Sequence, residues 1–439
     1  MAIHNFGSVC SGIEAASYTL QPMGVNALWL SEIAEYPTRF LASQYPDHPN
    51  LGDMTNIPNR IIEGEIPVPD LLVGGTPCQA FSLAGWRNGV NDERGQLTLR
   101  YIDIIDAIDA KRAEQGLGRA IFFWENVEGA LTDKTNAFGC FLAGLAGLEE
   151  PVQVSKLKSA GVLHGPNRNI AWRVLDAKYF GVPQQRKRVY VLGGGVDFHP
   201  ENVLFEMGGR FQDPYKLRDS QPQAVMDLFG EAESEINQDV IRPLRRNING
   251  HDIEVFRCYS DCLYAAYGTK WNGNAAAFNG SLFVSQDGRL RRLTPVECER
   301  LMGFPDNYTA IANPRLTNRY QATGNSWAVP VIRWIMNRLL EATNNNNIQQ
   351  IALPRPQLVN DNFTLYMFDD FTNVGGQFLN ASNSCYDFVL TNMLDIVDTE
   401  PDEKLYISPA GCAGILRRKR EHNAGMNARL EIVLENCSN

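Results

Sequence analysis

The sequence lacks the signals that would place this chain in a membrane, on a secretory route or around a zinc ion. No apolar run approaches the roughly 18 residues of a membrane span. Residues 1–7 contain neither a basic region nor a long apolar core, so no secretory signal is visible. The six histidines and nine cysteines show no zinc-ligand spacing, and an odd number of cysteines without framework spacing is typical of reduced thiols. We therefore expect a cytoplasmic protein without a bound metal.

An overall positive charge is also missing, because the formal net charge is −10. This argues weakly against a protein that coats nucleic acid, but it leaves room for a basic cleft on an acidic body. The charges are segregated: residues 197–239 are strongly acidic, whereas residues 242–292 contain more lysine and arginine than aspartate and glutamate. The second segment is a candidate for facing phosphates, with a solvated charged surface as the alternative.

Apolar runs alternate with helical patterns over the first part of the chain. Leu71–Val73 and Ala120–Trp124 are typical of buried strands, and Tyr101–Lys111 between them fits a helix. Alternation of this kind predicts an α/β fold with a doubly wound, mostly parallel sheet. From about residue 196 the period is lost, which favours a smaller, irregular domain of α+β or β type. Later segments with an apolar or helical pattern are Pro295–Met302, Val329–Leu340 and Tyr386–Val397.

The most informative motif is Pro77-Cys78-Gln79, just after the apolar run Leu71–Val73. Gly-Gly-Thr-Pro breaks that run, so Cys78 is predicted to lie on a loop past a strand end. Ligands bind at such strand ends in open α/β sheets. For a lone cysteine a structural thiol is the common alternative, and the loop position favours a reactive one.

Three further strand ends carry groups suited to a nucleoside. Gly12 follows the first strand, where backbone N–H groups can approach an anionic group at a helix N-terminus. Glu32 ends the second strand, where a carboxylate can accept hydrogen bonds from ribose hydroxyls, and Asp53 ends the third unit. Each residue alone has an alternative as a cap or turn residue. Their succession favours an adenosine-type cofactor.

A second set of polar groups follows the apolar run that ends at Trp124. Glu125 stands at this strand end beside aromatic residues, where desolvation would raise its pKa and let it hold a proton for a ring nitrogen. A helix N-cap or a loop ion pair is the alternative for this residue. Arg186 and Arg188 alternate, so both are expected on one face of a strand start, where guanidinium groups suit an anion or a base carbonyl. A solvated charged face is the alternative for this basic run.

Together these residues resemble the DNA (cytosine-5) methyltransferase family over about 1–195 and 289–343. The resemblance is carried, in the family's order, by Pro77-Cys78-Gln79, Glu125-Asn126-Val127, Gln184 to Tyr190, Arg291 to Pro305 and Gly324-Asn325-Ser326. Residues 6–16, 50–54 and 413–418 look like the branch found in bacteriophages and prophages. The family commonly has an aromatic residue at the position of Cys10 and a second glycine at that of Glu14.

The resemblance implies a mechanism. Cys78 would attack C6 of a cytosine flipped out of duplex DNA, Glu125 would act at N3, and Arg188, with Arg186 nearby, would hold O2. The methyl donor would be S-adenosylmethionine. Its site would comprise Ser11, Gly12, Ile13, Glu32, Ile33, Asp53, Met54, Pro77, Leu97 and Asn325. Candidate DNA contacts are Gln79, Ser82, Arg242, Arg245, Arg246 and Lys270.

The same resemblance implies a domain plan. Residues 1–195 with 320–343 would form the catalytic domain, and residues 196–319 would read the DNA sequence. The composition itself predicts a linker over 344–359 that leads to an appended module at 360–439. We expect a monomer in a bacterial or phage-infected cytoplasm. The alternatives are an RNA cytosine methyltransferase, a non-catalytic DNA-binding relative, and an enzyme that uses a bulkier sulfonium donor.

Overall fold

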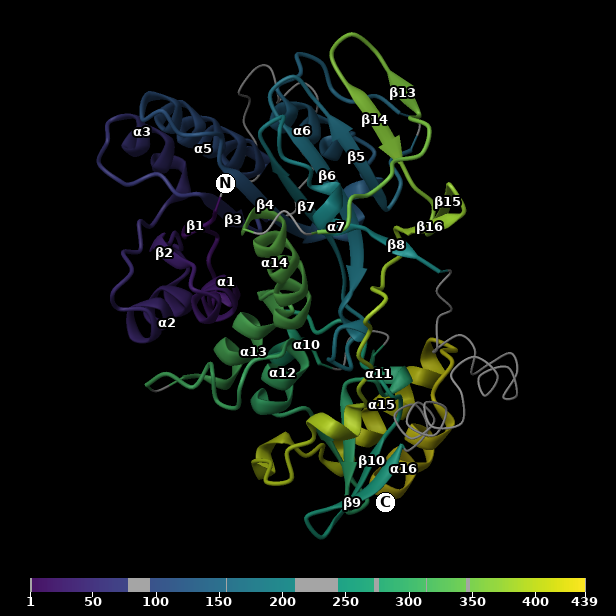
Figure 1. Cartoon of the computed structure of the whole chain (residues 1–439). Coiled ribbons are helices and arrows are strands. Elements are labelled where there is room, and N and C mark those ends of the chain that lie inside the picture. Colours follow the sequence, from purple (N-terminus) through teal and green to yellow (C-terminus); the bar gives the residue numbers. More distant parts are fainter. Residues whose placement is uncertain are drawn as a thin grey trace. The chain divides into compact units, whose positions relative to one another are not determined.

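The computed structural model describes residues 2–77, 95–154, 156–209, 244–271, 276–312, 314–344 and 348–438 (Figure 1). The chain divides into two compact units. The first comprises Met1–Asp176, Lys187–Phe211 and Val331–Tyr386. The second comprises Ala177–Arg186, Gln212–Pro330 and Asp387–Asn439.

The first unit is built around a nine-stranded sheet in the order β13-β14-β5-β6-β7-β4-β3-β1-β2. Its strands are β1 (Asn5–Val9), β2 (Asn26–Trp29), β3 (Leu71–Gly74), β4 (Ile121–Val127), β5 (Ala160–His164), β6 (Asn169–Asp176), β7 (Lys187–Gly194), β13 (Leu358–Val359) and β14 (Thr364–Met367). The strands β4-β3-β1-β2 are parallel, whereas those from β7 to β13 pair antiparallel. The mixed α/β class is thus confirmed, with an antiparallel half that the sequence pattern did not reveal.

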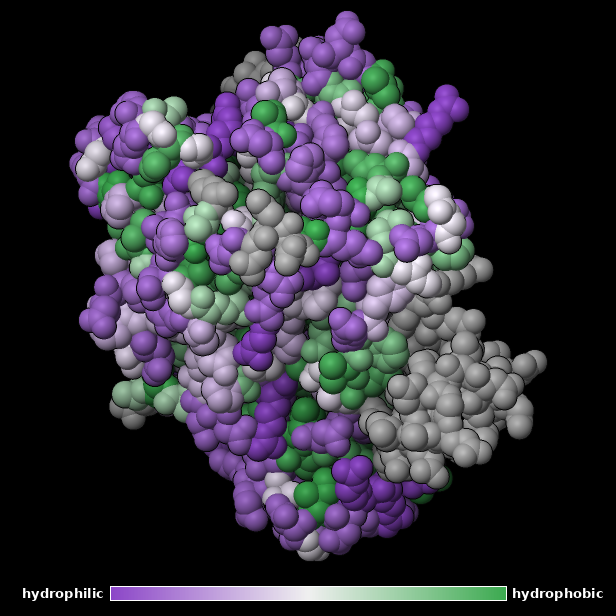
Figure 2. All heavy atoms as spheres, in the orientation of Figure 1, coloured by the Kyte–Doolittle hydropathy of each residue, from purple (hydrophilic) through white to green (hydrophobic). Residues whose placement is uncertain are grey.

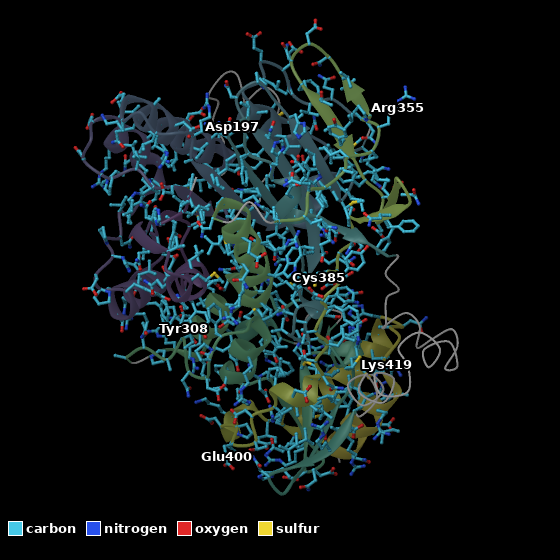
Figure 3. All side chains as sticks on the ribbon, viewed as in Figure 1. Asp197, Tyr308, Arg355, Cys385, Glu400 and Lys419 are labelled. Carbon is cyan, nitrogen blue, oxygen red and sulfur yellow. The ribbon has the colours of Figure 1, made fainter. Side chains whose placement is uncertain are left out.

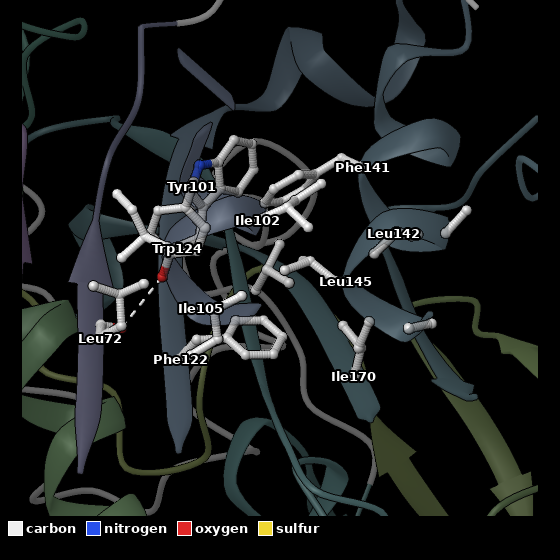
Figure 4. Close-up of a cluster of buried hydrophobic side chains, with 14 of the residues drawn as sticks. Leu72, Tyr101, Ile102, Ile105, Phe122, Trp124, Phe141, Leu142, Leu145 and Ile170 are labelled. Atoms are coloured by element: carbon white, nitrogen blue, oxygen red, sulfur yellow. Dashed lines mark hydrogen bonds between the residues drawn. The ribbon is translucent and has the colours of Figure 1, made fainter. Parts of the chain in front are cut away.

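The helices of this unit are α1 (Ala15–Leu20), α2 (Glu35–Gln44), α3 (Ile57–Ile62), α5 (Gly95–Glu114), α6 (Ala137–Ala146), α7 (Glu201–Leu204) and most of α14 (Val329–Asn344). Figure 4 shows side chains of α5 and α6 packed against the sheet. The phenol oxygen of Tyr101 on α5 lies 3.2 Å from the carbonyl oxygen of Leu72 and 2.9 Å from that of Phe123. This contact joins α5 to the strand that leads into the Pro77-Cys78-Gln79 loop.

The second unit contains a four-stranded antiparallel sheet, which agrees with the α+β or β pattern expected after residue 196. Its order is β12-β11-β10-β9, with β9 (Arg245–Ile248), β10 (His251–Val255), β11 (Phe283–Gln286) and β12 (Arg289–Arg292). Alternate residues of these strands enter two different apolar clusters, one with Val284 and the other with Phe283. The helices are α10 (Tyr267–Lys270), α11 (Ala276–Asn279), α12 (Pro295–Met302), α13 (Leu316–Asn325), α15 (Pro409–Glu421) and α16 (Ala428–Ser438).

Residues 360–439 do not form one appended module. β14 extends the nine-stranded sheet, and β16 (Gln377–Asn380) pairs with β8 (Glu206–Gly208) and β15 (Phe371–Val374) in the first unit. In the second unit, α15 and α16 bury Ile415, Leu430 and Leu434 against Phe283 and Leu290. The chain therefore needs its last part to complete both cores.

The helix expected over Tyr386–Val397 is also wrong. Only Met393–Ile396 forms a single 3₁₀ turn (η5), capped by the Asn392 side chain, which accepts a hydrogen bond from the Leu394 N–H. Val389 instead forms a parallel bridge with Phe180. Met393, Leu394, Ile396 and Val397 are buried in the apolar cluster beside the four-stranded sheet, and such packing does not require a helix, whereas Val389 is 55% exposed.

The face of the molecule drawn in Figure 2 is predominantly polar. Figure 2 shows hydrophilic residues over much of the visible face, with smaller apolar patches between them. Lys419 on α15, labelled in Figure 3, pairs with Glu431 on α16. None of the helices in the described ranges has the length and apolar character that crossing a membrane requires.

Candidate active site

The first strand of the sheet ends in a turn that presents backbone N–H groups. Gly12 adopts φ +56°, a left-handed conformation that glycine reaches without strain. Its N–H donates to Glu32 Oε2 at 2.8 Å, and the Ser11 N–H donates to the Ser31 carbonyl at 3.1 Å. The structure thus brings together the turns after β1 and β2, which carry Gly12 and Glu32.

The third turn joins the same edge through Asn50, a residue that sequence reasoning missed. Its Oδ1 accepts from the Glu32 N–H at 2.9 Å and from the Gly52 N–H at 3.1 Å. Its Nδ2 donates to the Glu32 carbonyl at 3.0 Å. Asp53 Oδ1 accepts from the Thr55 N–H at 2.9 Å and so caps the 3₁₀ turn η2 (Met54–Asn56). The cap function, one of the two roles considered for Asp53, is therefore present.

The other residues predicted to bind the methyl donor have varied surroundings. Ile13 and Met54 are buried, and the Cys10 thiol lies 3.7 Å from the Met54 sulfur. Ile33 is 74% exposed beside Glu32, so it offers an apolar surface at this edge. Pro77 is exposed, Leu97 is half-buried, and Asn325 is an exposed residue of the second unit.

Glu125 and Arg188 form an ion pair on neighbouring strands. β4 and β7 run antiparallel with Val127 opposite Arg188 and Glu125 opposite Tyr190. Alternation therefore puts the Glu125 and Arg188 side chains on one face. Arg188 Nε lies 3.1 Å from Glu125 Oε1, and both side chains are largely buried. The pairing places a carboxyl and a guanidinium side by side at one end of two interior strands. The two residues are 63 positions apart in the sequence.

Arg186 does not share this arrangement. It precedes β7 and belongs to the second unit, where its buried guanidinium donates to the carbonyls of Leu263, Gly324 and Ser326 at 3.1, 3.1 and 2.7 Å. Gly324 is required there because a Cβ would lie 2.6 Å from the Ala265 nitrogen. Arg186 therefore holds the Gly324-Asn325-Ser326 segment in place, a different role from the one expected beside Arg188.

Residues to which the sequence analysis gave no individual role hold the strand end that precedes Cys78. Asn126 Nδ2 donates to the Thr76 carbonyl at 2.9 Å, and Trp124 Nε1 donates to Thr76 Oγ1 at 3.0 Å. Thr76 Oγ1 also lies 3.0 Å from Thr98 Oγ1 on α5. These contacts fix the strand end two residues before Cys78. Cys78, Gln79, Ser82 and Arg242 themselves lie outside the described residues.

The other candidate DNA contacts lie on the second unit. Arg245 is paired with Asp252, and Arg246 lies 3.6 Å from Asp395. Lys270 is exposed at the end of α10. Nowhere in the described segments do three or more histidine, cysteine, aspartate or glutamate side chains gather in a way that would hold a metal ion.

Comparison with models of protein families shows to which family this chain belongs. A family model described as C-5 cytosine-specific DNA methylase matches residues 4–341, more than half of the chain. The chain belongs to this family. It is therefore a member of a family of DNA cytosine methyltransferases, and methyltransferases of this family use S-adenosylmethionine as the methyl donor.

Individual relatives of this family member differ in name and length. The "DNA N-6-adenine-methyltransferase" of Escherichia phage P1 is 34% identical over 77% of this chain, and the match covers 61% of the phage protein. The chain thus spans about three-fifths of that relative. Type II methyltransferase M.HhaI of Haemophilus parahaemolyticus is 27% identical over 75% of this chain and 92% of its own length. A solved Entamoeba histolytica methyltransferase covers 79% of this chain at 15% identity, with a TM-score of 0.46, and all of its own chain is covered.

The residues of this methylase fit such a donor by their hydrogen-bonding capacity. Glu32 Oε1 accepts from the Ile33 and Ala34 N–H groups at 2.8 and 2.7 Å, whereas Oε2 accepts from Gly12. A carboxylate oxygen accepts about two hydrogen bonds, so Oε2 has capacity for a ribose hydroxyl. The exposed side chain of Ile33 is suited to the face of an adenine ring.

The buried carboxyl of Glu14, next to the turn that follows β1, predicts how the stability of the protein depends on pH. Burial raises the pKa of Glu14 to about 7, against opposing hydrogen bonds from Ser8 and Ser17. Because the folded protein then binds this proton more tightly than the unfolded chain does, stability is greatest below the ordinary carboxyl pKa and falls as pH rises through about 7. The free energy of unfolding should lose up to roughly 3 kcal/mol from this group. Urea unfolding between pH 4.5 and 8.5 should show this loss, and Glu14→Gln should flatten it; equal slopes in both proteins would contradict the assignment.

Proposed function

We propose that this protein transfers a methyl group from S-adenosylmethionine to C5 of a flipped-out cytosine in a specific duplex DNA sequence. The Glu125–Arg188 pair carries this proposal. The pair lies in the same unit as the turn of Gly12 and Glu32. Glu125 stands on β4, the strand next to β3, and β3 leads to Cys78. The family membership supports cytosine in DNA as the substrate.

Cys78 is proposed as the nucleophile. C5 of cytosine is a poor nucleophile, and addition of a thiolate at C6 converts the ring into an enamine that is reactive at C5. The donor supplies an electrophilic methyl group when it is bound. Loss of the C5 proton and breakage of the Cys78–C6 bond then release the methylated base. The target base must leave the stack because these atoms are inaccessible in a duplex.

Glu125 and Arg188 are proposed to hold the ring during this attack. A protonated Glu125 would donate to N3 and so stabilise the electrons that addition at C6 pushes into the ring. The Arg188 guanidinium would donate to O2. Their 3.1 Å contact fixes each group against the other, so that little reorientation is needed when the base arrives.

The two units are proposed to divide the work between them. The first would hold the donor and the catalytic groups, and the second, with Arg245, Arg246 and Lys270, would contact the DNA. Arg186 would act within the second unit, by holding the Gly324-Asn325-Ser326 segment through the carbonyls that flank Asn325. The relatives support two settings, a phage genome and a restriction–modification pair, and we expect a monomer in either.

Adenine methylation is the rival suggested by the name of the phage relative. An exocyclic amine can attack a methyl donor directly, so N6 chemistry has no use for a thiol adduct or a group at a pyrimidine N3. The Glu125–Arg188 pair beside the strand that leads to Cys78 therefore favours cytosine.

Transfer from labelled S-adenosylmethionine tests the proposal. Duplex DNA and transfer RNA should be offered separately, and the products digested to nucleosides. We expect 5-methylcytosine from DNA only. N6-methyladenine as the product, or label in transfer RNA alone, would contradict the proposed substrate. Mapping the methylated positions in DNA from expressing cells would then define the recognition sequence.

Glu125→Gln should lower kcat by roughly 10²- to 10⁴-fold, because glutamine cannot deliver a proton to N3. Donor affinity should stay within about two-fold of the parent. Glu128→Gln, an exposed glutamate three residues further on, is the matched control and should leave kcat unchanged. Single-turnover methylation at saturating donor measures the effect; a normal rate for the Glu125→Gln protein would remove Glu125 from the chemistry.

A further inference from the structure

Glu14 occupies a position whose backbone favours glycine. It is the N-cap of α1 with φ +57° and ψ +56°, the left-handed conformation. Such a conformation is unfavourable for a non-glycine residue, because its Cβ lies too close to the following carbonyl oxygen. Its side chain is also 1% exposed, although carboxylates are seldom buried without strong partners. A residue that carries both penalties must make contacts that glycine could not make.

Those contacts form a chain of hydrogen bonds, called the relay below. The relay leads to the turn of Ser11 and Gly12 proposed to bind the methyl donor, called the donor turn below. Ser8 Oγ lies 3.1 Å from Glu14 Oε2 and 2.9 Å from Ser11 Oγ. Ser11 Oγ accepts from the Ser31 N–H at 3.1 Å. The Ser17 N–H lies 3.4 Å from Glu14 Oε1, which ties the carboxyl to α1. The carboxyl thus connects the first turn of α1 with the turns that follow β1 and β2.

The relay has enough donors and acceptors for either protonation state of the carboxyl. When Glu14 is ionised, the Ser8 hydroxyl donates to it and the Ser11 hydroxyl donates to Ser8 Oγ. When Glu14 is protonated, it donates to Ser8 Oγ, Ser8 donates to Ser11 Oγ, and Ser11 donates to the Ser8 carbonyl, 3.2 Å away. A glutamine amide can imitate the protonated form. An alanine leaves the Ser8 hydroxyl without this partner.

We propose that Glu14 is a positioning residue for the methyl donor. By holding Ser8 and, through it, Ser11, it fixes the turn in which Gly12 bonds to Glu32 and thereby sets the distance between the Gly12 backbone and the Glu32 carboxylate. This rests on the proposed function, in that this turn binds S-adenosylmethionine. Because the relay lies under the donor turn, Glu14 acts on donor affinity and leaves the chemistry at cytosine unchanged.

A purely structural residue would behave differently, and glycine separates the two cases. Glu14→Gly relieves the backbone conformation but removes the relay, whereas Glu14→Gln keeps the relay. If Glu14 serves only the core, donor affinity should follow stability across the variants. If it positions the donor turn, affinity should follow the relay, so that the glycine variant binds weakly however stable it is.

The test is calorimetric titration of the full-length protein with S-adenosylmethionine alone, followed by steady-state methylation. Glu14→Ala and Glu14→Gly should each weaken binding by at least about ten-fold, the effect of losing a buried hydrogen-bond network. Glu14→Gln should stay within about three-fold of the parent. KM for the donor should rise in parallel, with kcat at saturating donor and KM for DNA within about two-fold. Glu63→Ala, an exposed glutamate on the same unit, is the control and should change nothing.

Two further outcomes make the result decisive. If Glu14→Ala does not fold, Ser8→Ala breaks the same relay with the glutamate retained, and it should weaken donor binding by about three-fold or more. Alanine and glycine variants that bind the donor as tightly as the parent would overturn the inference. A parent protein that binds no S-adenosylmethionine would overturn the proposed function and this inference with it; a parent that binds while all variants match it would overturn the inference alone.

Discussion

Cys78→Ala is expected to abolish methyl transfer to DNA while donor binding stays within about two-fold of the parent. The expected loss is of the order of 10⁴-fold or more, because without the thiolate no covalent path to a nucleophilic C5 remains. The turns of Gly12, Glu32 and Asn50, proposed to bind the methyl donor, make their hydrogen bonds without Cys78, so they should keep their geometry. Single-turnover methylation and calorimetry on the same preparation measure the two effects.

A trapping experiment makes this prediction more specific. DNA with 5-fluorocytosine at the target cannot lose a C5 proton after methylation, so the parent should remain covalently attached and survive denaturing electrophoresis. Cys78→Ala should give no such complex. Cys437→Ala, which removes a half-buried thiol from α16, is the control and should be trapped normally. Methylation by the Cys78→Ala protein at the parent rate would refute the nucleophile assignment.

Leu430→Asp is expected to destabilise the second unit by at least about 4 kcal/mol. Leu430 is fully buried on α16, among the apolar side chains of Phe283, Leu290 and Ile415. Burying an unpaired charge, together with the loss of the leucine contacts, belongs to the most damaging classes of substitution. DNA affinity should fall with the folded fraction of the second unit.

Ile432→Asp is the matched control for this prediction. It lies two residues further along α16 and is 56% exposed, so the same chemical change should alter stability by no more than about 0.5 kcal/mol. Urea unfolding followed by circular dichroism compares the two proteins. Equal stability of both variants would show that α16 is dispensable for the second unit, contrary to the packing described above.

Local patterns in the sequence were sufficient where the structure depends on near neighbours. The helix expected over Pro295–Met302 has these bounds in the structure, because Thr294 and Glu297 form a capping box and Gly303 ends the helix with a positive φ. Short apolar runs bounded by turn signals, such as Leu71–Val73, form buried strands, and this signal is local as well. The order of strand ends grouped Gly12 and Glu32 in one expected cofactor site, and the two residues are in contact in the structure.

Other features depend on residues distant in sequence, and local patterns gave no access to them. The apolar pattern of Tyr386–Val397 favours a helix, but Val389 forms a bridge with Phe180 instead. The contacts of Thr76 with Asn126 join residues 50 positions apart. Arg186 and Arg188 have identical side chains two residues apart, yet one bonds to backbone carbonyls and the other to Glu125, because β7 begins between them.

By itself, the sequence determined the α/β class, the family, and the residues proposed to perform the chemistry, because strand-end motifs and their order depend on local chemistry. Only the tertiary structure decided which of those residues meet. It paired Glu125 with Arg188, assigned Arg186 to the support of Gly324 and Ser326, and divided residues 360–439 between two cores. It also placed Glu14 in contact with Ser8 and, through it, Ser11, because a buried hydrogen-bond network is formed by packing, which the order of residues does not reveal.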